Sequence, residues 1–140
     1  MIRILMIEDN VEYAKAVRLL LSEVTEEEFD LVHVTRVGDG MLQLDHYIFD
    51  IILLDLMLPY KSGYSLLKMI REEDSSTVII VISSLDAKED ILSCTAISIQ
   101  GYMVKPVNLS QLNMKVLEYY GKTSVTHAKV AESFRQPIQE

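Results

Sequence analysis

Glu8, Asp9, Asp55 and Lys105 are the residues whose types and spacing point most directly to chemistry. Each stands directly after a short apolar run, with Glu8 and Asp9 adjacent after the first of them. Such runs predict strands that are buried on both faces of a sheet. The carboxyl ends of parallel strands meet at one edge of an open α/β sheet, so these side chains are expected to lie together. Carboxylates packed that closely repel one another, and Mg²⁺ is a hard cation that carboxylates, water and phosphate oxygens bind.

A carboxylate at such an edge is also a competent nucleophile towards phosphorus. Attack by Asp55 would form an acyl phosphate. Phosphoryl transfer depends chiefly on neutralising charge. A magnesium ion held by the three acids would cover part of the phosphoryl charge, and the compact ammonium of Lys105 would cover another oxygen. Ser83, with Ser84 beside it, ends a further apolar run and is placed to donate a hydrogen bond.

Each of these residues also has an ordinary structural explanation. Acids such as Glu8 and Asp9 are favoured at helix starts by the helix dipole. Asp55 could be a buried, hydrogen-bonded acid, and Ser83 could be a loop or capping serine. The chain contains neither GxGxxG nor GxxxxGK[ST], so a nucleotide bound in the dinucleotide or P-loop manner is not expected.

The elements that must position these side chains alternate between strand and helix. Runs rich in Val, Ile and Leu, with little alternation, predict five parallel strands: Ile2–Ile7, Asp30–Val34, Ile51–Leu54, Val78–Ile82 and Gly101–Val104. Apolar residues at helical spacing predict five helices: Val11–Ser22, Asp39–His46, Tyr64–Glu73, Lys88–Ile97 and Leu109–Tyr120. Asn10 is a candidate N-cap for the first helix, and Asn108 or Ser110 for the last. Five such units predict an α/β fold with one doubly wound sheet and helices on both faces.

The composition limits the class of protein. A length of 140 residues predicts one domain, and a net charge of −8 argues against a general binder of nucleic-acid backbones. The only cysteine, Cys94, cannot form an internal disulfide, and its apolar neighbours favour a packed thiol in a reducing compartment. No apolar stretch approaches the roughly 20 residues that span a bilayer, and the N-terminus is not patterned as a signal peptide. We therefore expect a cytoplasmic protein without membrane contact.

Several short motifs make the chain resemble the receiver domain of two-component response regulators, of the chemotaxis type. The motifs are Glu8-Asp9, Asp55-Leu56-Met57-Leu58-Pro59 with Gly63 soon after, Ser83-Ser84, Tyr102 and Lys105-Pro106. Each motif alone is weak, but together they occur in the family's order and spacing. They cover roughly residues 1–120. The resemblance implies a flavodoxin-like (βα)5 fold with strand order 2-1-3-4-5.

The resemblance also implies how the phosphoryl group is received. Asp55 accepts it from a sensor histidine kinase or a phosphotransfer protein, and Ser83 and Lys105 bind it. Ser84 stands where a smaller alanine or glycine is common, and its hydroxymethyl group is expected either to bind the phosphoryl group through a further hydrogen bond or to narrow access to Asp55. Ser83 and Tyr102 then move as a switch. The change is read on the face formed by the fourth helix, the fifth strand and the fifth helix, as a two-state equilibrium that the new charge shifts.

The resemblance further implies a metal site. Mg²⁺, or Mn²⁺, is bound by the side chains of Asp9 and Asp55 and by the backbone carbonyl of Met57, and Glu8 usually acts through a bound water. The Lys105-Pro106 peptide bond is expected to be cis, a form that proline makes accessible.

The predicted function is a phosphorylation-activated signalling switch, which catalyses only its own phosphotransfer and dephosphorylation and is not an enzyme acting on an outside substrate. A phosphatase or phosphomutase with an aspartyl nucleophile carries a second acid two positions later, where this chain has Met57. A flavin-binding carrier needs a Ser/Thr/Gly-rich phosphate loop, where this chain has Glu8-Asp9-Asn10. The alternative that stays open is a pseudo-receiver that binds partners without phosphorylation.

Residues 1–121 are predicted to be the receiver domain, and the polar residues 122–140 a tail or a linker. The expected partners are the kinase or phosphotransfer protein and a possible output domain or downstream protein, as in an N-terminal receiver of a longer regulator. No direct nucleic-acid binding by this domain is expected. We expect a monomer or a phosphorylation-dependent dimer.

Other positions depart from the family's pattern or do not contribute to it. Ser98 replaces a frequent glycine, so the turn before the fifth strand is expected to differ. Gln100-Gly101 replaces an acidic pair that is usual in winged-helix regulators, which argues against their mode of dimerisation. His33, His46 and His127 have no metal-ligand spacing and are predicted to be surface or packing residues.

Overall fold

The strands form one parallel sheet in the order β2-β1-β3-β4-β5, as the resemblance implied. The structure is a computed structural model and describes residues 1–24, 28–59, 62–108 and 110–119. The strands are Ile2–Ile7 (β1), Phe29–Val34 (β2), Ile51–Leu54 (β3), Val78–Ser83 (β4) and Gly101–Val104 (β5). β1, β3 and β5 have the predicted bounds, and β2 and β4 are each one residue longer. The predicted tail, residues 122–140, lies outside the described residues.

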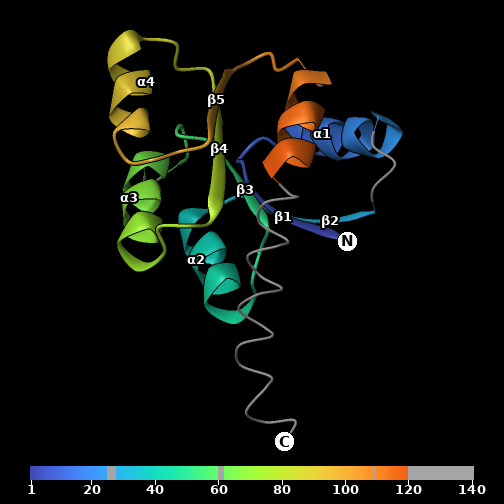
Figure 1. Ribbon diagram of the computed structural model, residues 1–140, viewed down its shortest axis with the longest axis horizontal. Coiled ribbons are helices and arrows are strands. Elements are labelled where there is room, and N and C mark those ends of the chain that lie inside the picture. Colours follow the sequence, from blue (N-terminus) through green and yellow to red (C-terminus); the bar gives the residue numbers. More distant parts are fainter. Residues whose placement is uncertain (25–27, 60–61, 109, 120–140) are drawn as a thin grey trace, which may run out of the picture.

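Within the described residues, five helices connect or follow these strands (Figure 1). They are Val11–Val24 (α1), Val37–His46 (α2), Gly63–Glu73 (α3), Lys88–Thr95 (α4) and a fifth helix at residues 110–119. α2 begins two residues before its predicted start because Val37, only 5% exposed, packs into the core. α4 ends two residues before its predicted end, where the chain turns towards β5. The fold is thus the predicted α/β arrangement.

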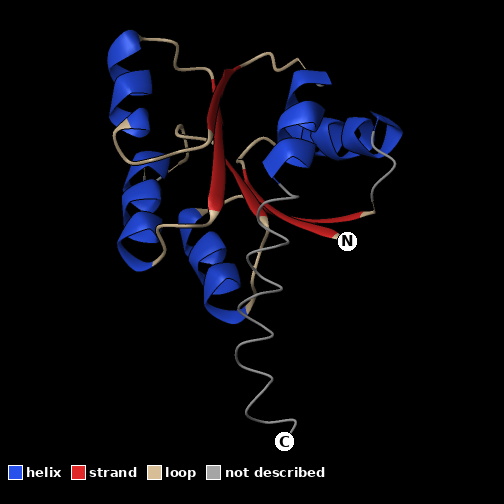
Figure 2. Ribbon diagram, in the orientation of Figure 1, coloured by secondary structure: helices blue, strands red, loops and turns tan. Residues whose placement is uncertain are grey.

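The sheet separates two apolar layers, because successive side chains of each central strand point to opposite faces. In β1, Ile4 and Met6 belong to the layer that α1 and the fifth helix cover, whereas Leu5 and Ile7 belong to the layer under α2, α3 and α4. Figure 2 shows the red strands between these two groups of blue helices. Both faces of the sheet are therefore covered, and the ends of the central strands are where polar side chains gather.

Capping side chains fix where three of the helices begin. Asn10 accepts a hydrogen bond from the backbone N–H of Tyr13 at 2.9 Å, and Asn108 accepts one from Gln111 at 3.1 Å, which confirms the two predicted caps. The Ser62 hydroxyl accepts the backbone N–H of Tyr64 at 3.1 Å at the start of α3. Two of these caps lie beside the strand ends that carry the candidate site.

Two predictions from composition can be compared with the structure. Cys94 is fully buried in α4, and burial raises the pKa of its thiol, as expected for a packed cysteine. Among the residues that the structure describes, no helix combines the length and the apolar character needed to cross a membrane.

Ser98 adopts the backbone conformation that a glycine would accept more easily. Its φ is 69°, and it is the only non-glycine residue with positive φ in the described part of the chain. Arg71 donates to its backbone carbonyl through Nε at 3.2 Å and through Nη2 at 2.8 Å. The turn therefore keeps a left-handed residue at this position, and the difference from the family's frequent glycine is that a serine adopts it.

Ser98→Gly is expected to increase the free energy of unfolding by about 0.5–1 kcal/mol. Relief of left-handed strain contributes about 1–2 kcal/mol, and the greater freedom of glycine in the unfolded chain removes about 0.5–1 kcal/mol of it. The Arg71 bonds go to the backbone carbonyl and survive the change. Urea denaturation measures the effect as a raised midpoint at constant slope. Ser75→Gly, at a position without positive φ, is the control. If both variants lost the same amount of unfolding free energy, the argument would be contradicted.

Candidate functional site

The register of the sheet brings three of the predicted site residues to one edge. Ile7 pairs with Leu54 across β1 and β3, so Glu8 and Asp55 each directly follow the last residue of their strand, at the same edge. The backbone N–H of Asp55 donates to the Ile7 carbonyl at 3.0 Å, and that of Lys105 donates to the Ser83 carbonyl at 2.9 Å. The parallel sheet therefore places Glu8, Asp55 and Lys105 side by side, although they are far apart in the sequence.

Three carboxylates gather at this edge. Oxygens of Glu8, Asp9 and Asp55 all lie within 4.8 Å of one another. Glu8 is 1% exposed and Asp55 5%, whereas Asp9 is exposed at the rim. The donors are hard oxygen atoms close enough to share one ion, which is the set that Mg²⁺ or Mn²⁺ prefers. The residues present thus fit the metal that the sequence predicted.

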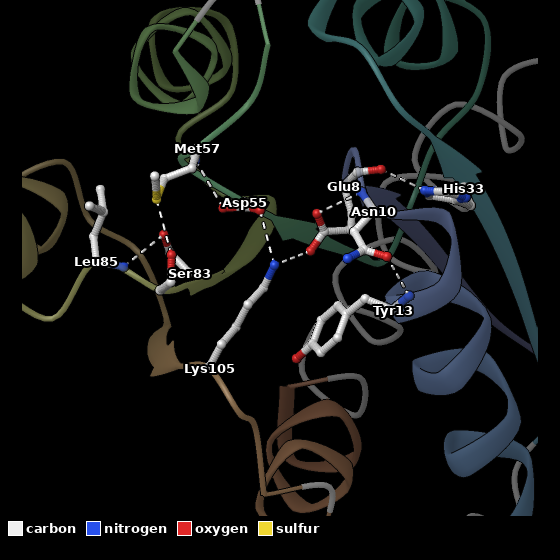
Figure 3. Close-up of polar contacts among 10 residues, drawn as sticks. Glu8, Asn10, Tyr13, His33, Asp55, Met57, Ser83, Leu85 and Lys105 are labelled. Atoms are coloured by element: carbon white, nitrogen blue, oxygen red, sulfur yellow. Dashed lines mark hydrogen bonds and ion pairs between the residues drawn. The ribbon is translucent and has the colours of Figure 1, made fainter.

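Lys105 supplies positive charge to the same cluster. Its ammonium is ion-paired with Oε1 of Glu8 and lies 3.1 Å from Oδ2 of Asp55 (Figure 3). Burial would lower the pKa of this ammonium, but the bonds to Glu8 and Asp55 outweigh burial and raise it. Lys105 is therefore a fixed cation at neutral pH. The Lys105-Pro106 bond is cis, as expected.

Glu8 is held from three sides. Its Oε2 accepts the backbone N–H of Asn10 at 3.2 Å, while its Oε1 faces Lys105. Its backbone carbonyl accepts a hydrogen bond from Nε2 of His33 at 2.7 Å. His33 was predicted only to be a surface or packing residue. Its contact with the Glu8 carbonyl was missed because no local pattern links β2 to the end of β1.

Burial raises the pKa of Glu8 from 4.5 to about 7, although Lys105 and the Asn10 amide lower it. The folded protein therefore keeps a proton that the unfolded chain loses near pH 4.5. Stability of the metal-free protein should fall as the pH rises from about 4.5 to about 7, by on the order of 2 kcal/mol. Urea unfolding in a chelator at about pH 5 and about pH 7.5 would measure this slope. Glu8→Gln should lack this contribution, and equal slopes in both proteins would refute it.

The segment after Asp55 folds back over it. The backbone N–H of Met57 donates to Oδ1 of Asp55 at 2.9 Å, and the N–H of Gly63 donates to the Leu56 carbonyl at 3.0 Å. The Met57 side chain is 52% exposed, and its sulfur accepts the Ser84 hydroxyl at 3.0 Å. Ser84 thus lies at the rim of the site, bonded to Met57.

Ser83 and Tyr102 meet at the backbone of Leu85. Ser83 is fully buried, and its hydroxyl oxygen accepts the Leu85 N–H at 3.3 Å. The Tyr102 hydroxyl donates to the Leu85 carbonyl at 2.7 Å, and burial raises its pKa. The two residues that were predicted to move are therefore linked through a single peptide segment next to the site.

Tyr13 is a member of this site that the sequence did not reveal. Its ring centroid lies 4.4 Å from the Lys105 ammonium. Within the sequence Tyr13 is simply one residue of the first amphipathic helix. Its distance from Lys105 in the chain leaves no spacing rule by which the contact could have been found.

Comparison with known proteins agrees with this fold. The family model of the response regulator receiver domain matches residues 4–117. The chain therefore belongs to the response regulator receiver domain family, and its general role lies in two-component signalling.

Relatives and solved structures give the extent of the similarity. The chain is 34% identical over 115 residues to the cell cycle response regulator CtrA of Brucella ovis, which covers 81% of this chain and 48% of CtrA. It is 29% identical over 116 residues to the transcriptional regulatory protein CiaR of Streptococcus pneumoniae, covering 83% and 50%. The chain thus spans about half the length of these relatives. A CheY-like receiver domain protein from Methanospirillum hungatei shares the fold with a TM-score of 0.80 at 21% identity, over 90% of this chain and 98% of that one.

Proposed function

We propose that this receiver domain is a phosphorylation-activated switch in which Asp55 accepts the phosphoryl group. The observation that carries the proposal is the position of the Asp55 carboxylate. It lies 3.1 Å from the Lys105 ammonium and has an oxygen within 4.8 Å of oxygens from Glu8 and Asp9. A carboxylate placed beside metal ligands and a fixed cation is suited to receive a group whose transfer depends on charge neutralisation.

In the proposed transfer, a carboxylate oxygen of Asp55 attacks the phosphorus of a phosphohistidine. A P–O bond to Asp55 forms while the P–N bond breaks, and the imidazole keeps the electron pair of that bond and takes a proton from solvent. Oδ1 is held by the Met57 amide, so we expect Oδ2, which faces Lys105, to react. The Lys105 ammonium then pairs with a phosphoryl oxygen in place of the free carboxylate.

The proposed metal ligands are the side chains of Glu8, Asp9 and Asp55 and the backbone carbonyl of Met57. A bound Mg²⁺ or Mn²⁺ ion supplies neutralisation of charge on the phosphoryl oxygens. The chain's own contribution is to keep these ligands at one edge, with Glu8 fixed by Asn10 and His33.

The signal would leave the site through Leu85. A new negative charge on Asp55 attracts the Ser83 hydroxyl as a donor, and Ser84 beside it can donate as well. Because Ser83 and Tyr102 both bond to the Leu85 backbone, a shift of Ser83 changes the segment that holds Tyr102. We therefore propose that phosphorylation is read on the face formed by α4, β5 and the fifth helix, as a shift between two states.

The partners follow from the same chemistry. A sensor histidine kinase or a phosphotransfer protein is the proposed donor, and the domain is proposed to catalyse only its own phosphotransfer and dephosphorylation. CtrA and CiaR are named as regulators and are about twice as long as the matched segment, which supports an output domain or a downstream partner. The charge of −8 supports the absence of direct nucleic-acid binding by this domain. A monomer or a phosphorylation-dependent dimer is proposed.

The mass of the intact protein after incubation with Mg²⁺ and acetyl phosphate tests the proposal. We expect one added phosphoryl group, and none when Mg²⁺ is chelated or when Asp55 is replaced in Asp55→Asn. Asp50→Asn is the matched control, since Asp50 is a buried acid next to the opposite end of β3 and should not affect the reaction. No adduct at any time would overturn phosphoacceptance and favour a pseudo-receiver that works by partner binding alone.

A further inference from the structure

The ring of Tyr13 lies beside the ammonium that is central to the site. Lys105 Nζ is 4.4 Å from the ring centroid, well within the range in which a cation is attracted to an aromatic face. Figure 3 shows the Tyr13 ring approaching Lys105 from α1, while the carboxylates of Glu8 and Asp55 lie on the other side of the ammonium. The ammonium thus has two kinds of partner, carboxylates and an aromatic face.

The position of Tyr13 depends on the acidic segment between β1 and α1, residues 8–10. Its backbone N–H donates to Oδ1 of Asn10 at 2.9 Å, which caps α1. The backbone N–H of Asn10 donates in turn to Oε2 of Glu8 at 3.2 Å, while Oε1 of the same carboxylate pairs with Lys105. Glu8 therefore orients both the lysine and the helical turn that carries the ring.

The rest of the Tyr13 side chain is anchored in the core. Its hydroxyl oxygen is buried, and the residue packs against the same apolar layer as Val107, two positions after Lys105. Burial raises the pKa of Tyr13, and although Lys105 lowers it, the phenol stays neutral at neutral pH. The ring acts through its face and not through a charge.

We propose that Tyr13 is a positioning residue for phosphoryl transfer, whose ring holds the Lys105 ammonium at the acceptor edge while the carboxylates change partners. This inference rests on the proposed function of Asp55. When a metal ion or a phosphoryl group binds, the contacts between Lys105 and the carboxylates change. The Tyr13 ring binds neither the metal ion nor the phosphoryl group, so its contact with Lys105 can stay the same. A lysine on a flexible four-carbon stem would otherwise sample many positions, so a constant contact near its end keeps it aimed at Asp55.

Variants at position 13 separate the ring from the hydroxyl. Tyr13→Phe keeps the aromatic face and should phosphorylate within about two-fold of the wild-type rate, whereas Tyr13→Leu should be roughly five-fold slower with acetyl phosphate at saturating Mg²⁺. Tyr119→Leu is the matched control, because Tyr119 packs against the same layer and contacts a different lysine, Lys115, at 5.9 Å. It should leave the phosphorylation rate unchanged.

A spectroscopic readout makes the contact visible without any reaction. In the metal-free protein, the ε-methylene protons of Lys105 should show an upfield ring-current shift, which Tyr13→Phe keeps and Tyr13→Leu loses. If Tyr13→Leu fails to fold, phenylalanine and pentafluorophenylalanine installed at position 13 provide the same comparison. They have similar shape, but fluorination reverses the charge distribution of the face, so the fluorinated protein should be the slower.

The outcomes distinguish this inference from the proposed function. A wild-type protein that takes up no phosphoryl group would overturn the function and this inference with it. If the wild type is phosphorylated and Tyr13→Leu reacts at the same rate as the wild type, the inference alone is overturned. Equal rates for the phenylalanine and pentafluorophenylalanine proteins would overturn it in the same way. A rate that falls as far in Tyr13→Phe as in Tyr13→Leu would assign the effect to the hydroxyl and also refute the role of the ring.

Discussion

Lys105→Met should slow phosphorylation of Asp55 by about 100-fold, the scale expected when a positioned electrostatic group is lost from a transition state. The substitution keeps an unbranched side chain of nearly the same length and removes its charge. The ammonium lies 3.1 Å from Asp55 and is ion-paired with Glu8, and these acids are almost fully buried. Without it, one phosphoryl oxygen has no cation from the protein, and two buried carboxylates face each other uncompensated.

The same variant should also lose stability, by about 2–3 kcal/mol in metal-free buffer near neutral pH. The loss stays below that of a fully buried pair because Lys105 is 21% exposed and because Glu8 can take up a proton. Mg²⁺ should stabilise Lys105→Met more than the wild type, since the uncompensated carboxylates bind a cation more strongly. Urea unfolding with and without Mg²⁺, together with the rate of phosphorylation by acetyl phosphate, measures both effects.

Two further variants sharpen this experiment. Lys68→Met removes an exposed lysine on α3 and should change neither quantity. Adding Glu8→Gln to Lys105→Met removes one uncompensated charge, so it should return most of the lost stability while phosphorylation stays slow. Lys105→Met with wild-type stability and an unaltered response to Mg²⁺ would contradict the electrostatic account.

Gly63→Ala should destabilise the protein by about 3 kcal/mol, near the upper end of overpacking effects. A Cβ at this position would lie 2.1 Å from the carbonyl oxygen of Asp55 and 2.8 Å from the Cα of Leu56. Both obstacles are backbone atoms, so they cannot rotate away as a side chain would. The Asp55 peptide must therefore move. If Asp55 is the acceptor, as proposed, we also expect phosphorylation to slow by about ten-fold or more, because phosphoryl transfer depends on precise placement.

Gly38→Ala is the matched control for this steric argument. Gly38 lies in the first turn of α2, and a Cβ there would meet nothing within 4 Å. Alanine should therefore stabilise the helix by about 0.5–1 kcal/mol. Chemical denaturation measures both variants. If Gly63→Ala kept the wild-type midpoint and phosphorylation rate, the close approach of the Asp55 backbone would not be essential.

The sequence predicted the α/β fold, the resemblance to the receiver family supplied the strand order, and the strand ends predicted which side chains lie together at one edge of the sheet. Apolar runs ending in Glu8, Asp55 and Lys105 predicted strands whose carboxyl ends meet, and the register of β1, β3, β4 and β5 brings these residues together. The inference succeeds because burial on both faces imposes a local composition, and parallel strands put all their carboxyl ends on the same side. The helix caps at Asn10 and Asn108 followed from equally local chemistry.

The exact bounds of elements were less accessible. α2 starts earlier than its amphipathic pattern indicates because Val37 packs against the sheet, and this packing outweighs the weak helical preference of the neighbouring Gly38. Ser98 was identified as a departure from the family's glycine, but only the structure shows that it takes φ of 69° with its carbonyl held by Arg71. Arg71 is 27 residues away, so no local signal connects the two.

The sequence by itself therefore determined which side chains stand at the carboxyl edge of the sheet, because strand ends are encoded locally. Only the tertiary structure decided what surrounds them. The ring of Tyr13, on α1, meets Lys105, which follows β5, and His33 meets the Glu8 carbonyl across the pairing of β2 with β1. Such contacts depend on the distances and angles at which whole elements pack, and these are set by the filling of both apolar layers and not by the spacing of any motif.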